Sequence, residues 1–108
     1  MRIPLPPGLL RLPIAHRALH DRAAGRIENS PAAIRAAIDH GYAIEIDLQL
    51  SRDGVPMVFH DEDLDRLTAE AGPLAARSAA ALQAIRLKGS ADTIPTLLDV
   101  LALVGGRV

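Results

Sequence analysis

Two carboxylates stand two residues apart in a segment where apolar and polar side chains alternate. Glu45 and Asp47 lie on the polar side of residues 42–51, and isoleucines and leucines fill the other side. In a β-strand, side chains two apart leave the same face, roughly 6.5 Å from each other. If the strand were central in an α/β sheet, both of its faces would be covered, and the two carboxylates would repel each other and lose hydration. A hard divalent cation, Mg²⁺ or Ca²⁺, would then stabilise the pair. A one-sided sheet with a hydrated polar face would explain the same alternation.

A histidine in the next predicted strand, His60, extends this candidate site. Asp53-Gly54 is a strong signal for a two-residue hairpin turn. Such a turn would place Asp47 opposite His60 and Glu45 opposite Glu62. The predicted hairpin therefore gathers an Asp–His–Glu cluster.

His16 and Arg17 end the first predicted strand. A histidine just past the carboxyl end of a strand lies where α/β sheets and barrels bind ligands, and a guanidinium matches a phosphate bidentately. Taken singly, each has an ordinary explanation, as a histidine that supports loop backbone and as a solvated charge. His20, in a loop, and His40, in the last turn of a helix, receive no chemical role.

Two histidines, two carboxylates and one arginine together suit the cleavage of a phosphodiester. One imidazole would take a proton from the attacking hydroxyl and the other would protonate the leaving oxygen. A bound cation and Arg17 would neutralise the charge that develops on the phosphoryl group.

The elements that must position these side chains alternate between strands and helices. The predicted strands cover residues 9–15, 42–51 and 55–60. The predicted helices cover residues 30–41, 78–89 and 96–105, each with a capping residue at its start. This alternation indicates an α/β sheet, but a closed barrel of such units takes about 250 residues. We therefore expect part of a larger domain.

Composition excludes several other classes of protein. The 12 basic residues against 13 acidic ones give no electrostatic argument for nucleic acid, and the absence of cysteine excludes a disulfide framework and a thiolate nucleophile. No apolar run approaches the roughly 20 residues that span a bilayer. We expect no membrane span, no nucleic-acid partner and a cytoplasmic location.

Four segments in this order resemble the glycerophosphodiester phosphodiesterase family. They are IAHR at 14–17, EN at 28–29, EIDLQLSRDGVPMVFHDEDLDRLT at 45–68 and IPTLLDVL at 94–101. The resemblance implies an α/β fold in which residues 1–108 form the N-terminal part of a (β/α)8 TIM barrel, truncated before barrel closure. Residues from about 62 to 93 would correspond to the family's small insertion region.

The resemblance also implies a role for each candidate residue. Glycerophosphodiesters would be hydrolysed to glycerol 3-phosphate and an alcohol with a divalent cation, Mg²⁺ or Ca²⁺. The implied catalytic acid/base residues are His16 and His60, the phosphate ligand is Arg17, the metal ligands are Glu45 and Asp47, and the supporting residues are Glu28, Asn29 and Asp61. The family's third metal carboxylate lies in an E-x-K motif on the next strand, which this chain lacks.

Three further expectations follow from the resemblance. The family usually has glycine where this chain has Ala18, and a methyl group there disfavours a positive φ. The chain alone is expected to be inactive and to self-associate through open sheet edges. The alternatives are a truncated or degenerate homologue without turnover and a phosphodiesterase acting on another lipid head group.

Overall fold

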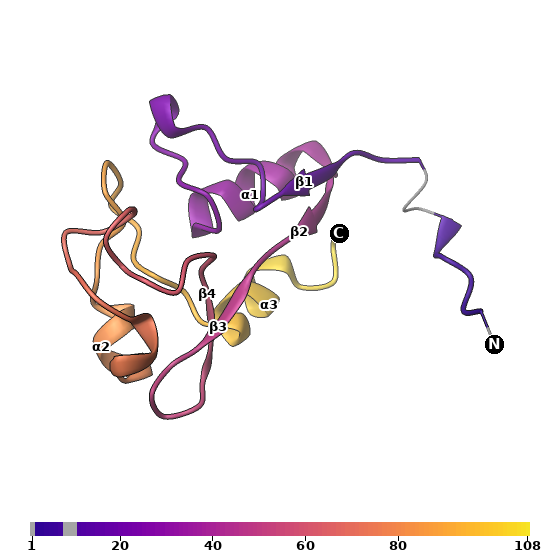
Figure 1. The fold of residues 1–108 in the computed structure, drawn as a ribbon. Coiled ribbons are helices and arrows are strands. Elements are labelled where there is room, and N and C mark those ends of the chain that lie inside the picture. Colours follow the sequence, from indigo (N-terminus) through magenta and orange to yellow (C-terminus); the bar gives the residue numbers. More distant parts are fainter. Residues whose placement is uncertain (1, 8–10) are drawn as a thin grey trace.

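The structure is a computed structural model that describes residues 2–7 and 11–108. Its strands and α-helices are β1 (Ile14–His16), α1 (Pro31–His40), β2 (Ala43–Glu45), β3 (Leu48–Leu50), β4 (Pro56–Val58), α2 (Ala79–Gln83) and α3 (Leu97–Val104). The described strands form two separate two-stranded sheets, β1–β2 and β3–β4. Figure 1 shows α1 beside the first sheet and α3 beside the second. No described helix has the length and apolar character needed to cross a membrane.

A strand–helix–strand unit opens the fold. β1 and β2 are parallel, with His16 paired to Glu45, and α1 is the crossover between them. Ser30 caps α1 by accepting a hydrogen bond from the Ala33 amide at 3.1 Å. Pro31 follows it, and the helix ends at Gly41 with φ +68°. The helix predicted over 30–41 is confirmed. The predicted first strand is shorter than expected, and residues 9 and 10 lie outside the described residues.

The strand predicted over 42–51 is broken into β2 and β3. β2 pairs with β1, whereas β3 pairs with β4 in an antiparallel hairpin. Ile44 and Ile46 pack against one core cluster, but Leu48 and Leu50 remain largely exposed. The alternating pattern therefore identifies the aliphatic face of this segment correctly. The structure covers only the half of that face that Ile44 and Ile46 form.

The hairpin is confirmed, but its predicted register is wrong by one residue. Leu48 pairs with Val58, and the backbone oxygen of Asp47 accepts from the Phe59 amide at 3.0 Å. Asp47 therefore lies opposite Phe59 rather than His60, and Glu45 lies beside His16 rather than opposite Glu62.

A longer turn explains this register. Ser51 and Val55 close the turn, since the Ser51 amide donates to the Val55 oxygen at 3.0 Å. The Ser51 hydroxyl accepts from the Val55 amide at 2.9 Å and donates to Asp53 at 2.6 Å. The turn thus includes Arg52 as well as the Asp53-Gly54 pair, and Gly54 supplies the positive φ that such a turn needs.

The helix predicted over 78–89 ends early. α2 begins at its predicted cap, Ser78, but stops at Gln83. Two residues that the prediction placed in the helix form bridges instead: Arg86 pairs with Thr93, and Leu87 pairs with Thr68, both antiparallel. The helix predicted over 96–105 is confirmed as α3, with Thr96 and Asp99 forming a capping box.

Strand β4 lies between two clusters of buried apolar side chains. Met57 and Phe59 point into one cluster, and Val58 points into the other, as the alternation of a strand dictates. The first cluster is otherwise built mainly by residues that follow the hairpin: Leu64, Leu67, Leu74, Ala79, Leu82, Ile85, Leu87 and Ile94. The second joins α1 and α3 through Ile34 and Val100.

Candidate active site

The parallel register of β1 and β2 sets the first part of the site. Because His16 pairs with Glu45, their side chains lie together, with His16 Nε2 3.8 Å from Glu45 Oε2. The Arg17 amide donates to the same carboxylate oxygen at 3.1 Å. His16 is open to solvent, its side chain 71% exposed. The site therefore begins at the carboxyl ends of two neighbouring parallel strands, as the sequence predicted for His16 and Arg17.

A tight bend after β1 aims the Arg17 side chain. Arg17 and Ala18 both take positive φ, 55° and 63°. The Ala18 amide donates to the backbone oxygens of Ala15 and Glu45, at 3.2 and 3.1 Å. The expected glycine conformation is thus present, and an alanine adopts it.

The Arg17 guanidinium lies between two carboxylates. Its Nη1 donates to Glu28 Oε2 at 2.8 Å, and its Nε is 3.8 Å from Asp47 Oδ2. The hydrogen bond to Glu28 raises the pKa of Arg17, so its charge is permanent. The Nε atom is buried and has no hydrogen-bond partner among the described residues.

Asn29 joins the loop after β1 to the break between β2 and β3. Its Nδ2 donates to Asp47 Oδ2 at 3.1 Å, and its Oδ1 accepts from the Asp47 amide at 3.3 Å. The Asp47 amide is therefore bonded to a side chain and not to a strand ladder. Asn29 is buried, with a φ of 59° and its own amide bonded to the Arg17 oxygen. The supporting position that the resemblance implies fits these contacts.

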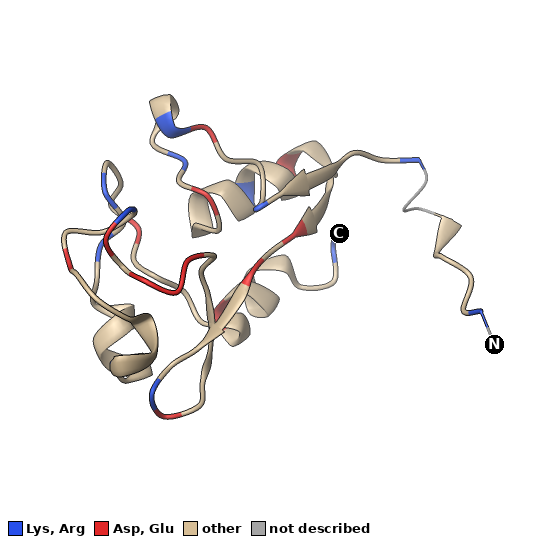
Figure 2. Ribbon diagram, in the orientation of Figure 1, with Lys and Arg blue, Asp and Glu red and all other residues tan. Residues whose placement is uncertain are grey.

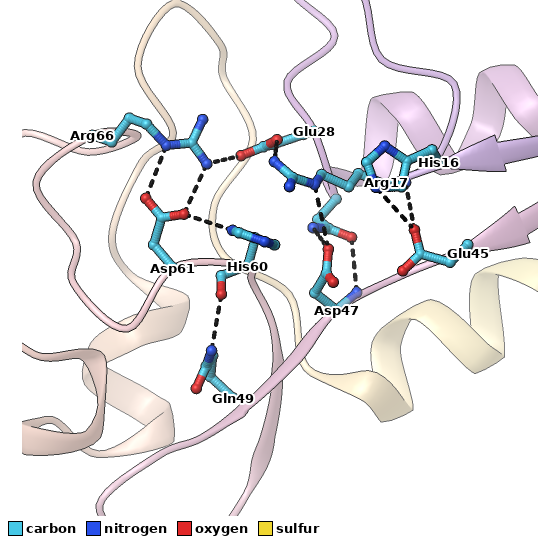
Figure 3. A network of polar contacts seen from close by, with 10 residues as sticks. His16, Arg17, Glu28, Glu45, Asp47, Gln49, His60, Asp61 and Arg66 are labelled. Carbon is cyan, nitrogen blue, oxygen red and sulfur yellow. Dashed lines mark hydrogen bonds and ion pairs between the residues drawn. The ribbon is translucent and has the colours of Figure 1, made fainter.

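The second histidine reaches this group through a chain of ion pairs. His60 Nδ1 is 2.8 Å from Asp61 Oδ1. Arg66 binds both oxygens of Asp61, with Nε at 2.8 Å and Nη2 at 2.9 Å, and Nη2 also pairs with Glu28. The network therefore runs from Arg17 through Glu28, Arg66 and Asp61 to His60 (Figure 3).

Charges of opposite sign alternate along this network. Figure 2 shows acidic residues of the β2–β3 segment, of the loop after β1 and of the segment after β4 around one region. Hydrogen bonds from Arg66 hold the pKa of the Asp61 carboxyl well below its usual value. Burial opposes the ionisation of Glu28, but hydrogen bonds from Arg17 and Arg66 outweigh it, and its pKa is also lowered. Both side chains are carboxylates at neutral pH.

Arg66 is a member of this network that the sequence did not indicate. It lies in a polar segment without periodicity, and neither strand nor helix spacing relates it to Glu28, 38 residues away. The run quoted for the family includes this position, and the only available signal was therefore the resemblance itself.

Glu45 and Asp47 are suitable donors for a divalent cation. Glu45 uses Oε2, and Asp47 uses Oδ2, in their contacts with the protein, and the other oxygen of each makes no hydrogen bond with the described residues. Two hard oxygen donors at the end of a sheet fit Mg²⁺ or Ca²⁺. Among the described residues no group of three or more His, Cys, Asp or Glu is close enough to hold a metal. Further ligands would be water, substrate or other protein groups.

The fold and site together define the class of protein. The chain is an α/β protein built like the first part of a (β/α)8 barrel, with its polar site at the carboxyl ends of the strands, where such barrels bind ligands. Residues 16–107 match the Glycerophosphoryl diester phosphodiesterase family. The chain belongs to this family.

Individual relatives agree with this assignment. A glycerophosphodiester phosphodiesterase from Caldanaerobacter subterraneus is 33% identical over 103 residues, which cover 89% of this chain and 41% of that protein. Glycerophosphodiester phosphodiesterase 1 from Bos taurus is 44% identical over 63 residues, 56% of this chain and 18% of that protein. The chain thus spans less than half the length of these curated relatives.

Solved structures give the same result for the fold. A phosphodiesterase from Oleispira antarctica, in complex with the product sn-glycerol-3-phosphate, superposes with a TM-score of 0.77 at 32% identity, over 91% of this chain and 42% of that one. A glycerophosphodiester phosphodiesterase from Thermotoga maritima gives 0.73 at 30% identity, over 89% and 40%. The predicted fold, part of a TIM barrel, is confirmed.

Proposed function

We propose that this chain supplies the acid/base histidines, the phosphate-binding arginine and two metal ligands of a phosphodiesterase that releases glycerol 3-phosphate from glycerophosphodiesters. One observation carries the proposal. A continuous network of contacts connects His16, Arg17 and His60, and it lies within the stretch that matches the family. The structural relative that binds sn-glycerol-3-phosphate supports this small-molecule class of substrate.

The histidines would share the proton transfers. One accepts the proton of the attacking hydroxyl, and the other donates a proton to the oxygen of the departing alcohol. His16 and His60 are both partly open to solvent, with side-chain exposures of 71% and 41%, so neither ring is sealed off from a small-molecule ligand. Arg17, whose side chain is 23% exposed, would bind the phosphoryl oxygens through its guanidinium group.

Glu45 and Asp47 would hold a divalent cation, Mg²⁺ or Ca²⁺. When bound, such a cation supplies positive charge that stabilises negative charge on the phosphoryl oxygens. Arg17 contacts the Glu45 carboxylate through its amide and lies near Asp47 through its side chain. A phosphate bound by Arg17 would therefore lie next to both carboxylates.

The test measures glycerol 3-phosphate release from glycerophosphocholine, with Mg²⁺, Ca²⁺ or a chelator. We would compare the 108-residue chain with a chimaera in which it is joined to the remaining barrel strands of the Caldanaerobacter relative. We expect chelator-sensitive turnover in the chimaera and none in the chain alone, because the chain lacks the E-x-K motif that the resemblance predicts. No turnover in either form, with several diesters tried, would favour the non-catalytic alternative.

Matched variants identify the residues responsible. His60→Ala and Glu45→Gln should each lower kcat of the chimaera by about 100-fold or more, in the range of lost acid/base or metal-ligand groups. His40→Ala is the matched control, since its ring lies at the end of α1, where it contacts the Ala36 oxygen and the Tyr42 ring and no residue of the network. Full turnover at saturating substrate in His60→Ala would contradict its role.

The cytoplasmic location of the protein stays a prediction.

We also propose that the chain self-associates. Both described sheets have only two strands, and Leu48 and Leu50 on β3 are exposed. Open strand edges are templates for pairing with another chain. Sedimentation from low to high micromolar concentration should show a rising mass, and a constant monomer mass over that range would refute the proposal.

A further inference from the structure

Arg66 is held from two sides by partners that belong to different parts of the chain. Glu28, 9% exposed, lies on the loop after β1, and Asp61 directly follows His60. The guanidinium uses Nε and Nη2 on the two oxygens of Asp61, and Nη2 also reaches Glu28. Glu28 is itself held by Arg17. Two carboxylates, Glu28 and Asp61, therefore fix the position of Arg66, and Arg66 restrains Asp61 in turn.

Asp61 in turn defines the orientation of the His60 ring. A carboxylate can only accept hydrogen bonds, so in the 2.8 Å contact the Nδ1 of His60 must be the donor. Donation from Nδ1 leaves Nε2 as the nitrogen without a proton in the neutral ring. The backbone of His60 is fixed separately, by the Gln49 side chain, which donates to its oxygen at 2.9 Å.

We propose that Arg66 is a positioning residue for His60. By binding both oxygens of Asp61, it keeps the imidazole in the Nδ1–H tautomer and leaves Nε2 for proton exchange with the substrate. The inference rests on the proposed function in one respect, the acid/base role of His60. The arrangement of Arg66, Asp61 and the ring is a property of the chain itself.

A merely structural role for Arg66 is the competing explanation. The arginine also connects the segment after β4 to the loop after β1, and any ion pair between two segments does this. The two explanations differ in what happens to the ring: a structural link affects stability alone, whereas a positioning residue changes which nitrogen of His60 carries the proton.

The experiment records ¹⁵N–¹H correlation spectra of the imidazole rings in the 108-residue chain, at a pH where the rings are neutral. The chain has four histidines, and the His60 signals are assigned by their loss in His60→Ala. In the wild type we expect Nδ1–H to dominate. In Arg66→Gln, Asp61 loses its bidentate partner, and the ratio of the two tautomers should fall about tenfold, as expected for a charge-assisted hydrogen bond.

Two further variants sharpen the result. Arg66→Lys keeps the charge, but an ammonium group cannot span both oxygens of Asp61, so we expect the tautomer ratio to fall here too. Arg77→Gln is the matched control, because Arg77 forms an exposed ion pair with Glu70 at 3.3 Å in the same part of the chain. It should leave the His60 ring unchanged.

Three results would overturn the proposal. The first is a wild-type His60 ring that is mainly Nε2–H. The second is a folded Arg66→Gln or Arg66→Lys chain with the wild-type ratio, and the third is an equal change in Arg77→Gln. This experiment measures no turnover, so it separates the two proposals. If Arg66→Gln changes the tautomer ratio but the chimaera proves inactive, the positioning role stands and only the proposed function is refuted.

Discussion

At the scale of single residues, the site depends on backbone conformations that side chains rarely adopt. Arg17, Ala18 and Asn29 all have positive φ and surround the polar network. For an L-residue this region costs roughly 1–2 kcal/mol, and such strain is concentrated at functional sites. The sequence indicated the position of the bend through the family's glycine, but not that an alanine would adopt it. The methyl group of Ala18 is buried in the cluster that contains Ile34 and Val58.

Substitutions at Ala18 test this balance. Ala18→Gly removes about 1 kcal/mol of strain but also loses a buried methyl worth about 0.8 kcal/mol, so the free energy of unfolding should stay within about 1 kcal/mol of the wild type. Ala18→Val adds a β-branched group at positive φ in a side chain only 2% exposed, and should destabilise by at least about 2 kcal/mol. Urea unfolding measures both. A Val variant as stable as the wild type would contradict the strained bend.

The two carboxylates that Arg66 binds predict a loss of stability in acid. The pKa values of Asp61 and Glu28 are lower in the folded chain than in the unfolded one. Both therefore stabilise the fold above their unfolded values of about 4, and the stabilisation disappears as the pH falls through the lower folded values.

Asp61→Asn tests this pH dependence. It should lower the free energy of unfolding by about 1 kcal/mol at pH 7, because the ion pair is partly screened by solvent. This difference from the wild type should shrink as the pH falls from about 4 towards 2, because the wild-type carboxylate loses part of its stabilising effect in that range. Asp63→Asn is the control, an exposed carboxylate without side-chain hydrogen bonds to the described residues. A deficit in Asp61→Asn that is unchanged from pH 7 to pH 2 would contradict the assignment.

At the scale of elements, local signals predicted what local interactions decide. Ser30 and Thr96 cap the helices where the sequence placed them, since a cap is a contact between residues three apart. The register of the hairpin depended on whether Arg52 joins the turn, which the Ser51 hydroxyl and Asp53 decide together. The end of α2 depended on Leu87 pairing with Thr68, 19 positions earlier, and no local pattern encodes such a bridge.

The capping box of α3 gives the prediction at this scale. The Thr96 hydroxyl accepts from the Asp99 amide, and the Asp99 carboxylate accepts from the Thr96 amide, both at 3.0 Å. Thr96→Ala should cost about 1 kcal/mol and speed amide exchange in the first turn of α3, whereas Thr96→Ser should retain the cap within about 0.5 kcal/mol. Equal effects of the two variants would show that the methyl group and not the hydroxyl matters.

At the scale of the whole molecule, β4 unites two cores that the sequence did not separate. The family resemblance indicated the order of elements and the residues of the site. It did not indicate that three successive residues in and just after β4, Met57, Val58 and Phe59, alternate between different clusters. The ion pair of Arg66 with Glu28 and the bond from the Ala32 amide to Asp92, at 2.9 Å, also cross between the two parts. These connections predict that both clusters unfold together.

Phe59 is the residue at which this coupling is tested. It is 1% exposed, and Phe59→Ala should cost about 3–5 kcal/mol, a large share of the 5–15 kcal/mol that domains possess. Phe59→Leu should cost less than about 1.5 kcal/mol. The single tyrosine, Tyr42, lies between α1 and β2, and both elements contribute to the cluster that does not contain Phe59, so its fluorescence probes this part of the chain. Because β4 is shared, tyrosine fluorescence and far-UV circular dichroism should give one coincident urea transition, shifted equally in each variant. A tyrosine transition that stays at the wild-type midpoint in Phe59→Ala would show instead that the two clusters fold independently.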